Sequence, residues 1–574
     1  MHQAHLYDAQ VSDSSLYAPD PAPPEPPLDG DSPPIQTGDL AERRGLFNPP
    51  SDQEVTDEPH LDRLNRLLLG TRRLALGGDR LFDWLGTFTI VAFAAVLRLI
   101  NLGRPHRLVF DETFYVKDGF SLWRLGFEAQ WPDGVNALFE AGNVTSYIDQ
   151  AAYVVHPQVG KWLIGLGIHL GGGAESAAAW RLANAVIGIL AVLLIIRIAR
   201  RLFASVPMAL LAGTLMAVDG TAIVHSRIAL LDQHLMFFVL LAFWFLILDR
   251  EQARRRLAVQ VAAELDAGST LSDFGPNLGM RWWRLAAGVS LGLATGVKWS
   301  GLYFIAVFGL MTVLWDVTAR RRAGIKRWLA GGVLEDGLLA FLMLVPVALL
   351  TYVASWFSWF TTPGAWGRGW AAQNPGQGIT WLPEGLRSFV RYHEQMWGFH
   401  TGLDATHAYA AHPLGWIVQW RPTAFYWERV DENVAVINSI GNPLLWWLAA
   451  LAIVAVTVLG ITRRDWRALA VVSGTIAGWV PWLAQSVLNP RTVFTFYTIV
   501  FTPWVILTLV YVAAVALEHT SEESKARARQ WVWTTIGVVL GLILVVSGLF
   551  YPLWTAMEVS FPYWRRMMWL GSWI

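Results

Sequence analysis

The residues whose types and spacing point most directly to chemistry are Asp111 and Glu112, which follow Phe110. They come shortly after a long apolar run that contains Arg98 and closes at Leu102. Carboxylates placed where a membrane span meets water are costly to hold near hydrocarbon and are more often functional than incidental. The pair therefore indicates a catalytic base at a membrane surface, although an acidic pair at the start of a helix can also serve only as its cap.

The composition defines the kind of protein that must position this pair. Of the 574 residues, 54% are hydrophobic, 15% are charged and 32 are tryptophans, which is typical of a polytopic membrane protein. The formal net charge is zero, so the overall charge gives no argument for a nucleic-acid partner. Cysteine is absent, which excludes disulfides, thiolate nucleophiles and cysteine metal sites.

The N-terminal segment differs from the rest of the chain. Residues 21–27 read Pro-Ala-Pro-Pro-Glu-Pro-Pro, and their acidic, proline-rich surroundings hold too little apolar content to fold alone. We therefore predict a disordered cytoplasmic tail over residues 1–70. The segment lacks the basic start, short apolar core and cleavage site of a secretory signal.

The apolar segments predict an all-α membrane bundle. About eleven of them reach the roughly 20 residues that a helix needs to cross a bilayer, within a domain expected over residues 81–554. Their approximate centres are Phe93, Ile189, Leu211, Leu240, Leu291, Gly309, Leu344, Leu451, Trp479, Leu507 and Leu542.

Basic residues predict the topology of this bundle. The basic clusters between spans fall on the same side as Arg72, and the positive-inside rule makes that side cytoplasmic. These clusters lie near Arg197, Arg254, Arg320, Arg463 and Arg527. The N-terminus is then inside, whereas two long loops (residues 103–179 with the acidic pair, and residues 355–442) and a C-terminal tail (residues 555–574) are outside. We expect a multi-pass protein of the plasma membrane whose site faces outward.

Five separate motifs follow one another along the chain. They are Phe110 to Tyr115, His156 to Lys161, Trp180 to Leu182, His225 to Asp232 and Gly296 to Gly301. In this order and spacing they resemble the protein O-mannosyltransferases, polytopic glycosyltransferases of the GT-C class, over about residues 81–551. The loop at residues 355–442 is too short for the β-trefoil insertion of the eukaryotic members, so the chain resembles the bacterial branch.

The resemblance implies an activity and a set of residue roles. Mannose would pass from polyprenyl-phosphate mannose to Ser or Thr hydroxyls of secreted proteins, with inversion at the anomeric carbon. Asp111 matches the family's first acid and would accept the hydroxyl proton, Glu112 would bind or orient the acceptor, and Arg98 would orient the acidic pair. Cations would stabilise the departing phosphate, and the residues that match this role are Arg181, Lys298, Lys161, His156 and Arg491.

Several of these residues also have a plainer interpretation. Arg181 could snorkel to the membrane interface, and Lys298 could be an interfacial lysine. His156 precedes a proline, which disfavours helical geometry, and could simply end an extended segment. Arg227 and Asp232 are close in sequence and fit a structural ion pair between spans as well as a contact to the donor.

The second long loop is rich in Trp, Tyr and His. The four histidines from His393 to His412 lack the spacing of a metal site, and the run that leads to Trp416 resembles instead the family's aromatic loop beside the active site. We interpret His412 as a donor-side or a structural residue. In the run that begins at Arg491, Tyr497 stands where the family has a histidine.

The resemblance implies no required cofactor, and we assign no metal ligands, although the acidic pair is of a kind that can bind a divalent cation. The expected partners are the lipid-linked sugar donor, a secreted or translocating protein acceptor, the export machinery and the membrane. Two other functions stay open. One is a GT-C transferase that modifies a lipid or a polysaccharide, and the other is a multi-span transporter, which would show two similar halves that this sequence lacks.

Overall fold

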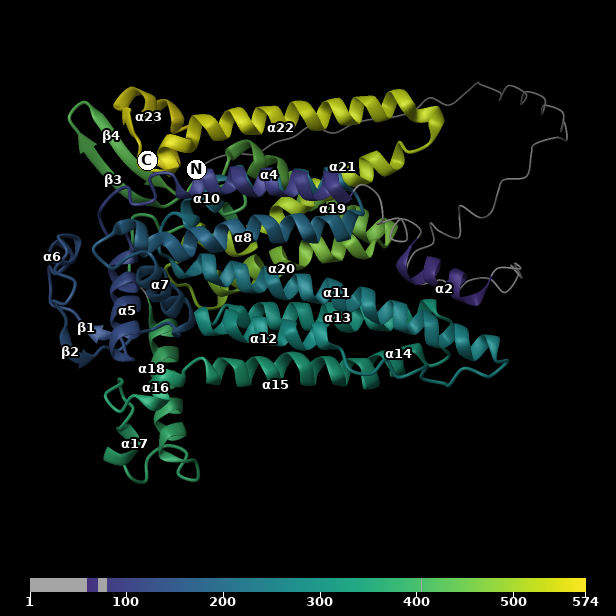
Figure 1. Cartoon of the computed structure of the whole chain (residues 1–574), viewed down its shortest axis with the longest axis horizontal. Helices are drawn as coiled ribbons and strands as arrows, with labels where there is room; N and C mark the ends of the chain where they lie inside the picture. Colours follow the sequence, from purple (N-terminus) through teal and green to yellow (C-terminus); the bar gives the residue numbers. More distant parts are fainter. Residues whose placement is uncertain (1–58, 71–79, 404) are drawn as a thin grey trace, which may run out of the picture. The chain divides into compact units, whose positions relative to one another are not determined.

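The computed structural model describes residues 59–70, 80–403 and 405–574. From residue 80 onward, long helices run side by side, and short elements gather at one end of them (Figure 1). We call this end the loop end. Within the described residues, nine helices are long and apolar enough to cross a membrane. They are α4 (Arg80–Leu99), α8 (Ala177–Phe203), α11 (Leu231–Asp266), α13 (Gly301–Arg322), the continuous run of α14 (Trp328–Ala330), η1 (Gly331–Gly337) and α15 (Leu338–Ala354), α19 (Pro443–Arg463), α20 (Trp466–Leu488), the run of η3 (Thr495–Phe501) and α21 (Thr502–His519), and α22 (Ala526–Trp554).

Every predicted span centre lies in a helix, but the predicted number of eleven spans is not confirmed. In the described chain a tenth span forms only if α9 (Val206–Val218) and α10 (Gly220–Ser226), bent by 61° where they meet, are taken together. The helix α12 (Trp282–Val297) has 16 residues, fewer than the roughly 20 that a perpendicular span needs. It packs against α15 at close range, since a Cβ on Gly292 would lie 2.6 Å from the Ala348 carbonyl oxygen.

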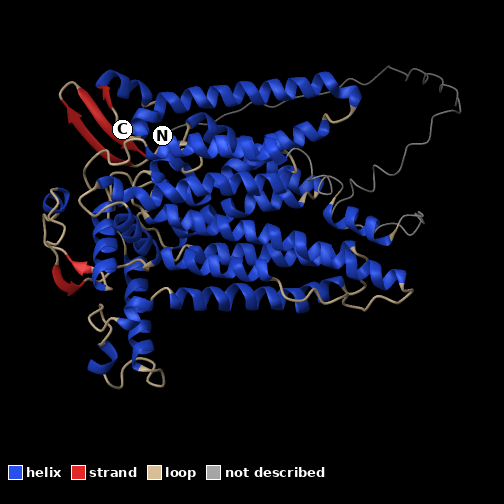
Figure 2. Ribbon diagram, viewed as in Figure 1, coloured by secondary structure: helices blue, strands red, loops and turns tan. Residues whose placement is uncertain are grey.

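The loop end consists of two groups of short elements and two small antiparallel sheets (Figure 2). The group between α4 and α8 contains α5 (Glu112–Leu125), β1 (Ala129–Gln130), α6 (Asn136–Glu140), β2 (Ile148–Ala151) and α7 (Val159–Leu170). The group between α15 and α19 contains α16 (Phe357–Thr361), α17 (Trp370–Gln373), α18 (Glu384–Gly402), η2 (Pro413–Gly415), β3 (Ala424–Val430) and β4 (Asn433–Asn438). The C-terminal residues complete this second group.

The predicted C-terminal tail is folded onto the loop end. Its β5 (Glu558–Ser560) is the third strand of a sheet in the order β3-β4-β5, and α23 (Phe561–Met567) and η5 (Gly571–Trp573) follow. The Trp573 indole N–H donates to the Gln419 carbonyl oxygen at 2.8 Å.

The opposite end of the bundle carries α2 (His60–Leu69). Leu64 and Leu68 of α2 are buried in an apolar cluster with Leu257 of α11, and Arg254 of α11 donates to the Leu68 carbonyl oxygen at 2.9 Å. The predicted disordered tail therefore ends in an ordered helix, while residues 1–58 lie outside the described residues. A short turn, η4 (Glu523–Lys525), leads into α22 at this same end.

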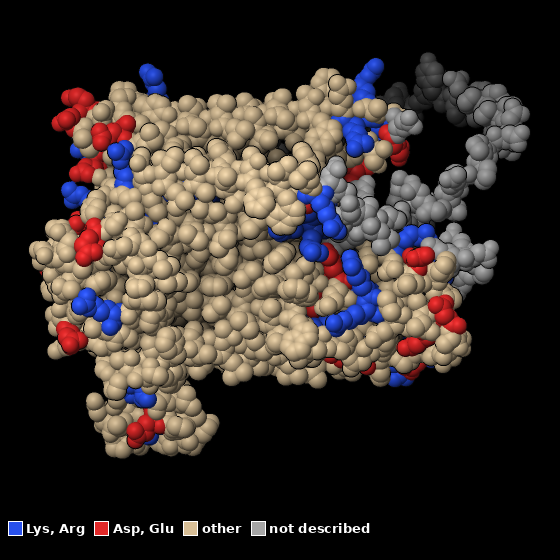
Figure 3. Space-filling view, in the orientation of Figure 1, with Lys and Arg blue, Asp and Glu red and all other residues tan. Residues whose placement is uncertain are grey.

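Charged side chains gather toward the two ends of the bundle. On the face shown in Figure 3, a broad band between these ends carries almost no Lys, Arg, Asp or Glu. An uncharged band around a set of long apolar helices is what a lipid environment requires. The arrangement agrees with the prediction of a multi-pass membrane protein.

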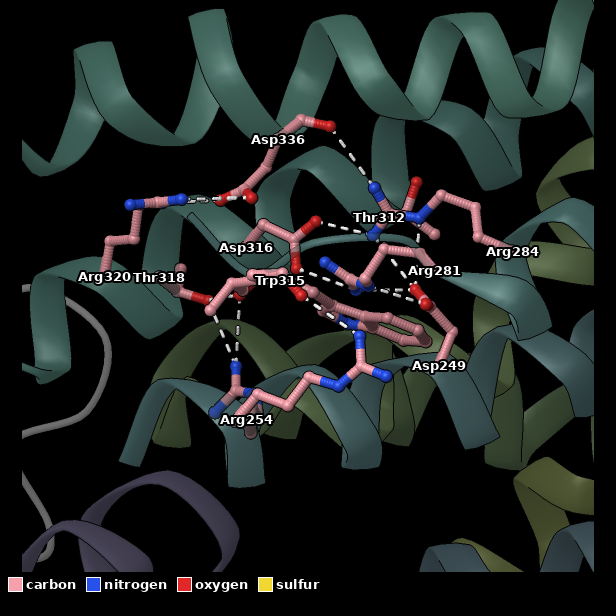
Figure 4. Close-up of polar contacts among 12 residues, drawn as sticks. Asp249, Arg254, Arg281, Arg284, Thr312, Trp315, Asp316, Thr318, Arg320 and Asp336 are labelled. Atoms are coloured by element: carbon pink, nitrogen blue, oxygen red, sulfur yellow. Dashed lines mark hydrogen bonds and ion pairs between the residues drawn. The ribbon is translucent and has the colours of Figure 1, made fainter. Parts of the chain in front are cut away.

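A buried set of charges joins four elements in the half of the bundle away from the loop end (Figure 4). This charge cluster consists of Asp249 of α11, Arg281 and Arg284 at the start of α12, Asp316 and Arg320 of α13, and Asp336 of η1. The shortest nitrogen to oxygen distances are 2.6 Å for Arg281 to Asp249 and for Arg284 to Asp316, and 2.5 Å for Arg320 to Asp336. Three arginines thus face three aspartates, and Arg320 also pairs with Glu335 at 3.3 Å.

Candidate active site

Asp111 is the half-buried residue at which α5 begins. The preceding Phe110 has a positive φ of 50°, which is uncommon for a bulky residue other than glycine. Four neighbouring rings hold the Phe110 ring at centroid distances of 5.1 to 5.9 Å: His407, Phe425, Phe494 and Phe496. Packing therefore maintains the strained turn that sets the position of the Asp111 carboxylate, as is common at functional sites.

The surroundings of the Asp111 carboxylate favour a neutral or easily protonated form. Tyr115, one turn along α5, donates to Oδ2 at 3.4 Å. Burial raises the pKa of Asp111 to about 6, an effect that Lys298 opposes and Asp232 reinforces. A carboxylate whose pKa lies close to neutrality is well suited to accept a proton from a hydroxyl group.

Lys298 and Asp232 form an ion pair beside Asp111. The Lys298 Nζ lies 2.8 Å from Oδ2 of Asp232 and 5.4 Å from the centre of the Tyr497 ring. Lys298 directly follows α12, and Asp232 lies in the first turn of α11, so two helix ends bring the pair to the loop end. Burial alone would lower the pKa of Lys298, but Asp232 and Tyr497 raise it, so the ammonium group stays charged.

A second cation reaches the site from the segment before η3. Arg491 donates to the His400 carbonyl oxygen at 3.3 Å, its guanidinium carbon is 5.8 Å from the centre of the Trp482 ring, and its buried Nε has no hydrogen-bond partner among the described residues. The rings of His156 and His400 are 5.3 Å apart. A buried donor without a partner at a charged site is a candidate contact for a ligand oxygen.

His156, predicted as a partner of the donor phosphate, is buried among cations. Burial lowers its pKa well below the usual value, and the neighbouring Lys298, His400, Lys161 and Arg491 lower it further, so its ring is neutral. Lys298, Lys161 and Arg491 lie around this neutral ring, and together they would stabilise an anion bound beside it. Lys298 and Arg491 are the two predicted phosphate ligands that lie close to both His156 and His400.

The structure does not support the predicted roles of Glu112 and Arg181. Both side chains are fully buried, and two guanidinium nitrogens lie 2.9 Å from the two carboxylate oxygens. The other guanidinium N–H groups donate to the carbonyl oxygens of Leu102, Pro105 and Arg107, and Glu112 also accepts from the N–H groups of Val109 and Ala229. Neither residue has a free position for a substrate, so the pair fixes the segment that leads into α5.

Lys161 and Arg98 are also taken up by structural contacts. The Lys161 Nζ lies 2.9 Å from Glu128 and 3.5 Å from Asp118, and the lysine is fully buried. Arg98 donates to the Ser226 hydroxyl and to the carbonyl oxygens of Met216 and Ala217 at the end of α9, rather than to the acidic pair. The sequence predicts correctly that these cations lie near the loop end but not which groups they contact.

Arg227 and Asp232 do not form an ion pair with each other. Arg227 donates to four carbonyl oxygens at and just after the end of α4, at 2.7 to 3.3 Å, and Asp232 pairs with Lys298 instead. His412 is exposed, and its Nδ1 accepts the N–H of Leu414, which caps η2. Arg227 and His412 therefore make contacts within the fold, whereas Asp232 lies beside Lys298 in the candidate site.

Tyr115, Tyr497 and His400 carry no predicted role, yet they line the site. Tyr115 stands four residues after Asp111 in the same motif, and that helical spacing is a signal that could have identified it. No such signal exists for His400. Its position beside Arg491 depends on how α18 packs across the loop end, which local sequence does not determine.

An apolar cavity of about 790 Å³ lies between α13 and α15. It begins at Trp299, which adjoins Lys298, and at His393 of α18, and it follows the two helices as far as Val313 and Gly337. Its lining is almost entirely aliphatic and aromatic. The position of its mouth beside a charged site suits a molecule with a long apolar chain and a polar head.

The residues that the structure describes contain no group of three or more His, Asp or Glu side chains arranged to hold a metal ion. Asp111 and Asp232 are both close to Lys298, whose positive charge already balances part of theirs. That the reaction requires no metal stays a prediction.

The bundle, its loop end and the site at their junction define a class of protein. The fold matches a chain of the Saccharomyces cerevisiae protein O-mannosyltransferase Pmt1-Pmt2 complex bound to the sugar donor, with a TM-score of 0.66 and 14% identity. The match covers 89% of this chain and 94% of the yeast chain. The fold is that of a GT-C glycosyltransferase, as the sequence predicts.

Sequence comparisons identify the family within that class. A family model described as dolichyl-phosphate-mannose-protein mannosyltransferase matches residues 155–263, and one for the C-terminal four-transmembrane region of protein-O-mannosyltransferase matches residues 385–573. The polyprenol-phosphate-mannose–protein mannosyltransferase of Mycobacterium tuberculosis is 32% identical over 517 residues, which are 86% of this chain and 92% of that relative. Its counterpart in Mycolicibacterium smegmatis is 33% identical over 520 residues, 86% and 94% of the two chains. The chain belongs to the protein O-mannosyltransferase family.

Proposed function

We propose that this protein transfers mannose from polyprenyl-phosphate mannose to Ser or Thr hydroxyls of proteins. The names of its mycobacterial relatives support the donor and the protein acceptor. The observation that carries the proposal is the juxtaposition of a base, Asp111, with the cation Lys298 at the mouth of an apolar cavity. A sugar that is activated by a lipid phosphate needs these three features together.

Asp111 acts as the general base of the reaction. As its carboxylate takes the proton of the acceptor hydroxyl, the oxygen attacks the anomeric carbon and the bond from that carbon to the phosphate oxygen breaks. Attack from the side opposite the leaving group inverts the configuration. Because the leaving group is a phosphate of low basicity, no second carboxylate is needed to protonate it.

Lys298 and Arg491 stabilise the departing phosphate. Both are cations at the same end of the bundle, and the Arg491 Nε has a hydrogen bond to give. Charged hydrogen-bond donors in a site that excludes water stabilise a developing negative charge strongly. Asp232 holds the Lys298 ammonium in place at 2.8 Å. The roles of Glu112 and Arg181 are to position Asp111 rather than to bind a substrate.

The cavity between α13 and α15 receives the polyprenyl chain. From Leu302 to Val313 the lining of α13 extends over about 16 Å at the helical rise of about 1.5 Å per residue. The head of the donor then lies at Trp299, beside Lys298. An apolar groove that starts at the phosphate site lets the lipid stay in the membrane while its sugar reaches Asp111.

The loop end faces outward from the plasma membrane, and the export machinery delivers the acceptor to it. Arginines at the ends of α8 and α13 away from the loop end, such as Arg200 and Arg321, support this orientation through the positive-inside rule. The N-terminus is then cytoplasmic. Translocating proteins would reach the site before they fold.

The test is transfer of radiolabelled mannose from polyprenyl-phosphate mannose to a Ser/Thr-rich peptide by purified protein. Wild type should label the peptide, and Asp111→Asn, matched in size and folding, should not. Label that enters an added lipid or polysaccharide instead of the peptide would assign a different acceptor. No label in any acceptor with demonstrably folded wild type would refute the transferase proposal.

A further inference from the structure

One part of the loop end projects sideways from the bundle. It consists of residues 357–402, from the start of α16 to the end of α18, and we call it the arm. Figure 1 shows α18 lying across the direction of the spans and continuing past α15, the outermost span on that side. The arm leaves the bundle directly after α15 ends at Ala354. It therefore lies at the level where the spans end.

The side of α18 that faces the rest of the arm is well packed. Phe389 and Tyr392 lie against Trp356 and Trp359, with ring centroids 5.3 to 6.1 Å apart. The C-terminal part of α18 is joined to the site by a contact of the His400 Nε2 with the Val155 carbonyl oxygen at 2.8 Å. The arm is thus a folded element with a fixed connection to the active site.

A second side of α18 is apolar but uncovered. Leu386, Val390 and Trp397 follow the spacing i, i+4, i+11 and so share one face of the helix, and His393, at the edge of that face, is packed against Trp299 and Trp356. Leu386 is 38% exposed and Trp397 is 64% exposed, and Trp381 just before the helix is 81% exposed. The third side carries polar residues such as Arg391 and Gln395.

His393 shows where this apolar face is directed. It lies at the edge of the face, its Nε2 is 2.6 Å from the Tyr352 hydroxyl of α15, and it lines the mouth of the cavity between α13 and α15. The face is therefore turned toward the spans and their lipid-facing groove, not toward water. Figure 1 shows none of the described chain beside the projecting part of the arm on that side.

We propose that the arm lies in the interfacial layer of the membrane, with Leu386, Val390, Trp397 and Trp381 among the lipids, and that it receives the lipid-linked donor at the cavity mouth. Tryptophan prefers the membrane interface, and an amphipathic helix parallel to the surface buries its apolar face there. The polar face pairs Arg391 with Glu394 at 3.1 Å, so it has no excess of positive charge. The attraction to lipid is hence apolar and does not require anionic headgroups. The second half of the proposal, donor reception, rests on the proposed function.

The first test measures where the arm lies. The chain has no cysteine, so single cysteines can be introduced and labelled without background. Nitroxides at Leu386→Cys and Trp397→Cys, with Arg391→Cys and Gln395→Cys as controls on the polar face, are compared in nanodiscs of phosphatidylcholine. Collisions with oxygen should dominate at the first two sites and collisions with a water-soluble nickel chelate at the controls. Equal exposure to water at all four sites, or shielding of the first two from both reagents by a second protein copy, would overturn the proposal.

The second test measures what the arm does. In the double variant Leu386→Ser with Trp397→Ser, the KM for a long-chain polyprenyl donor should rise about tenfold, which corresponds to the loss of about 1.4 kcal/mol of binding. The kcat should hold, and Gln395→Ser should leave both constants unchanged. A short-chain, water-soluble donor should not distinguish the double variant from wild type. An unchanged KM for the long-chain donor would refute donor reception by the arm. Absence of transfer in wild type as well would refute the proposed function, whereas the nitroxide measurement would still report the position of the arm.

Discussion

The same three helices, α11, α12 and α13, hold or adjoin two groups of buried charges that differ in how well the charges are matched. In the charge cluster, three arginines meet three aspartates at 2.5 to 3.4 Å, and several of these contacts are paired. In the candidate site, Asp111 has only a long hydrogen bond of 3.4 Å from Tyr115, and Lys298 has one carboxylate partner. In the first group the charges are matched among themselves and, within the described chain, only the buried Arg281 Nη1 has no hydrogen-bond partner, whereas the second group leaves room for a substrate.

The comparison gives a physical criterion for separating structural from functional charges in a membrane protein. A buried charge is costly unless it is paired, so charges that serve the fold should have full sets of partners. Glu112 and Arg181 lie next to the proposed base Asp111, yet their saturated contacts place them with the structural group. The number of hydrogen-bonding positions that a charged residue has left unfilled therefore indicates a functional role better than its distance from the base does.

The largest effect is expected at Asp111. Asp111→Asn keeps the size of the side chain but removes its ability to take a proton, so kcat should fall by about 10³- to 10⁴-fold. The thermal unfolding midpoint should not fall, because burial already disfavours the charged form of the carboxylate and its one hydrogen bond is long. Steady-state transfer and differential scanning fluorimetry on the same preparation would check both. Substantial remaining activity would remove Asp111 as the base.

The charge cluster should respond in the opposite way. Asp316→Asn leaves Arg281 and Arg284 with one carboxylate fewer in a buried setting, which should cost about 3 to 5 kcal/mol of stability. Transfer per folded molecule should be unchanged. The measurement is thermal unfolding in detergent together with activity normalised to folded protein. A loss of turnover without a loss of stability would show that the cluster acts on the site.

Replacing Lys298 should affect both activity and stability, because Lys298 has a buried ion-pair partner and a proposed role in stabilising the leaving group. Lys298→Met should lower kcat/KM by about 100-fold, the loss of one charged stabilising contact to the leaving group. It should also destabilise the protein, since Asp232 would be left buried and unpaired. The double variant with Asp232→Asn should recover the stability but not the activity. Recovery of both would assign Lys298 a structural role alone.

The sequence predicts the helices of the fold better than the contacts of the site residues, and the reason is physical. The lipid imposes long apolar helices, so Ile189, Leu240 and the other predicted centres all fall in helices, although α12 has only 16 residues. The order and spacing of the motifs predict that Asp111 and Lys298 belong to one site. They could not assign partners to Arg98 or Lys161, because a charge beside a membrane looks the same in sequence whether Ser226, Glu128 or a substrate satisfies it. The place of His400 depends on packing across the loop end.

The smallest predicted effect is a shift in the pH dependence of transfer, and it separates the two charges that act on Asp111. The base works in its deprotonated form, so with a pKa of about 6 the rate at low donor concentration should rise with pH and level off above that value. Lys298 lowers the pKa of Asp111 and Asp232 raises it. In the low residual activity of Lys298→Met the inflection should therefore move to higher pH, and in Asp232→Asn it should move to lower pH. Profiles of kcat/KM from pH 5 to 8, roughly the range in which such a group titrates, would measure both shifts. Movement of the two inflections in the same direction would mean that the titrating group is not Asp111.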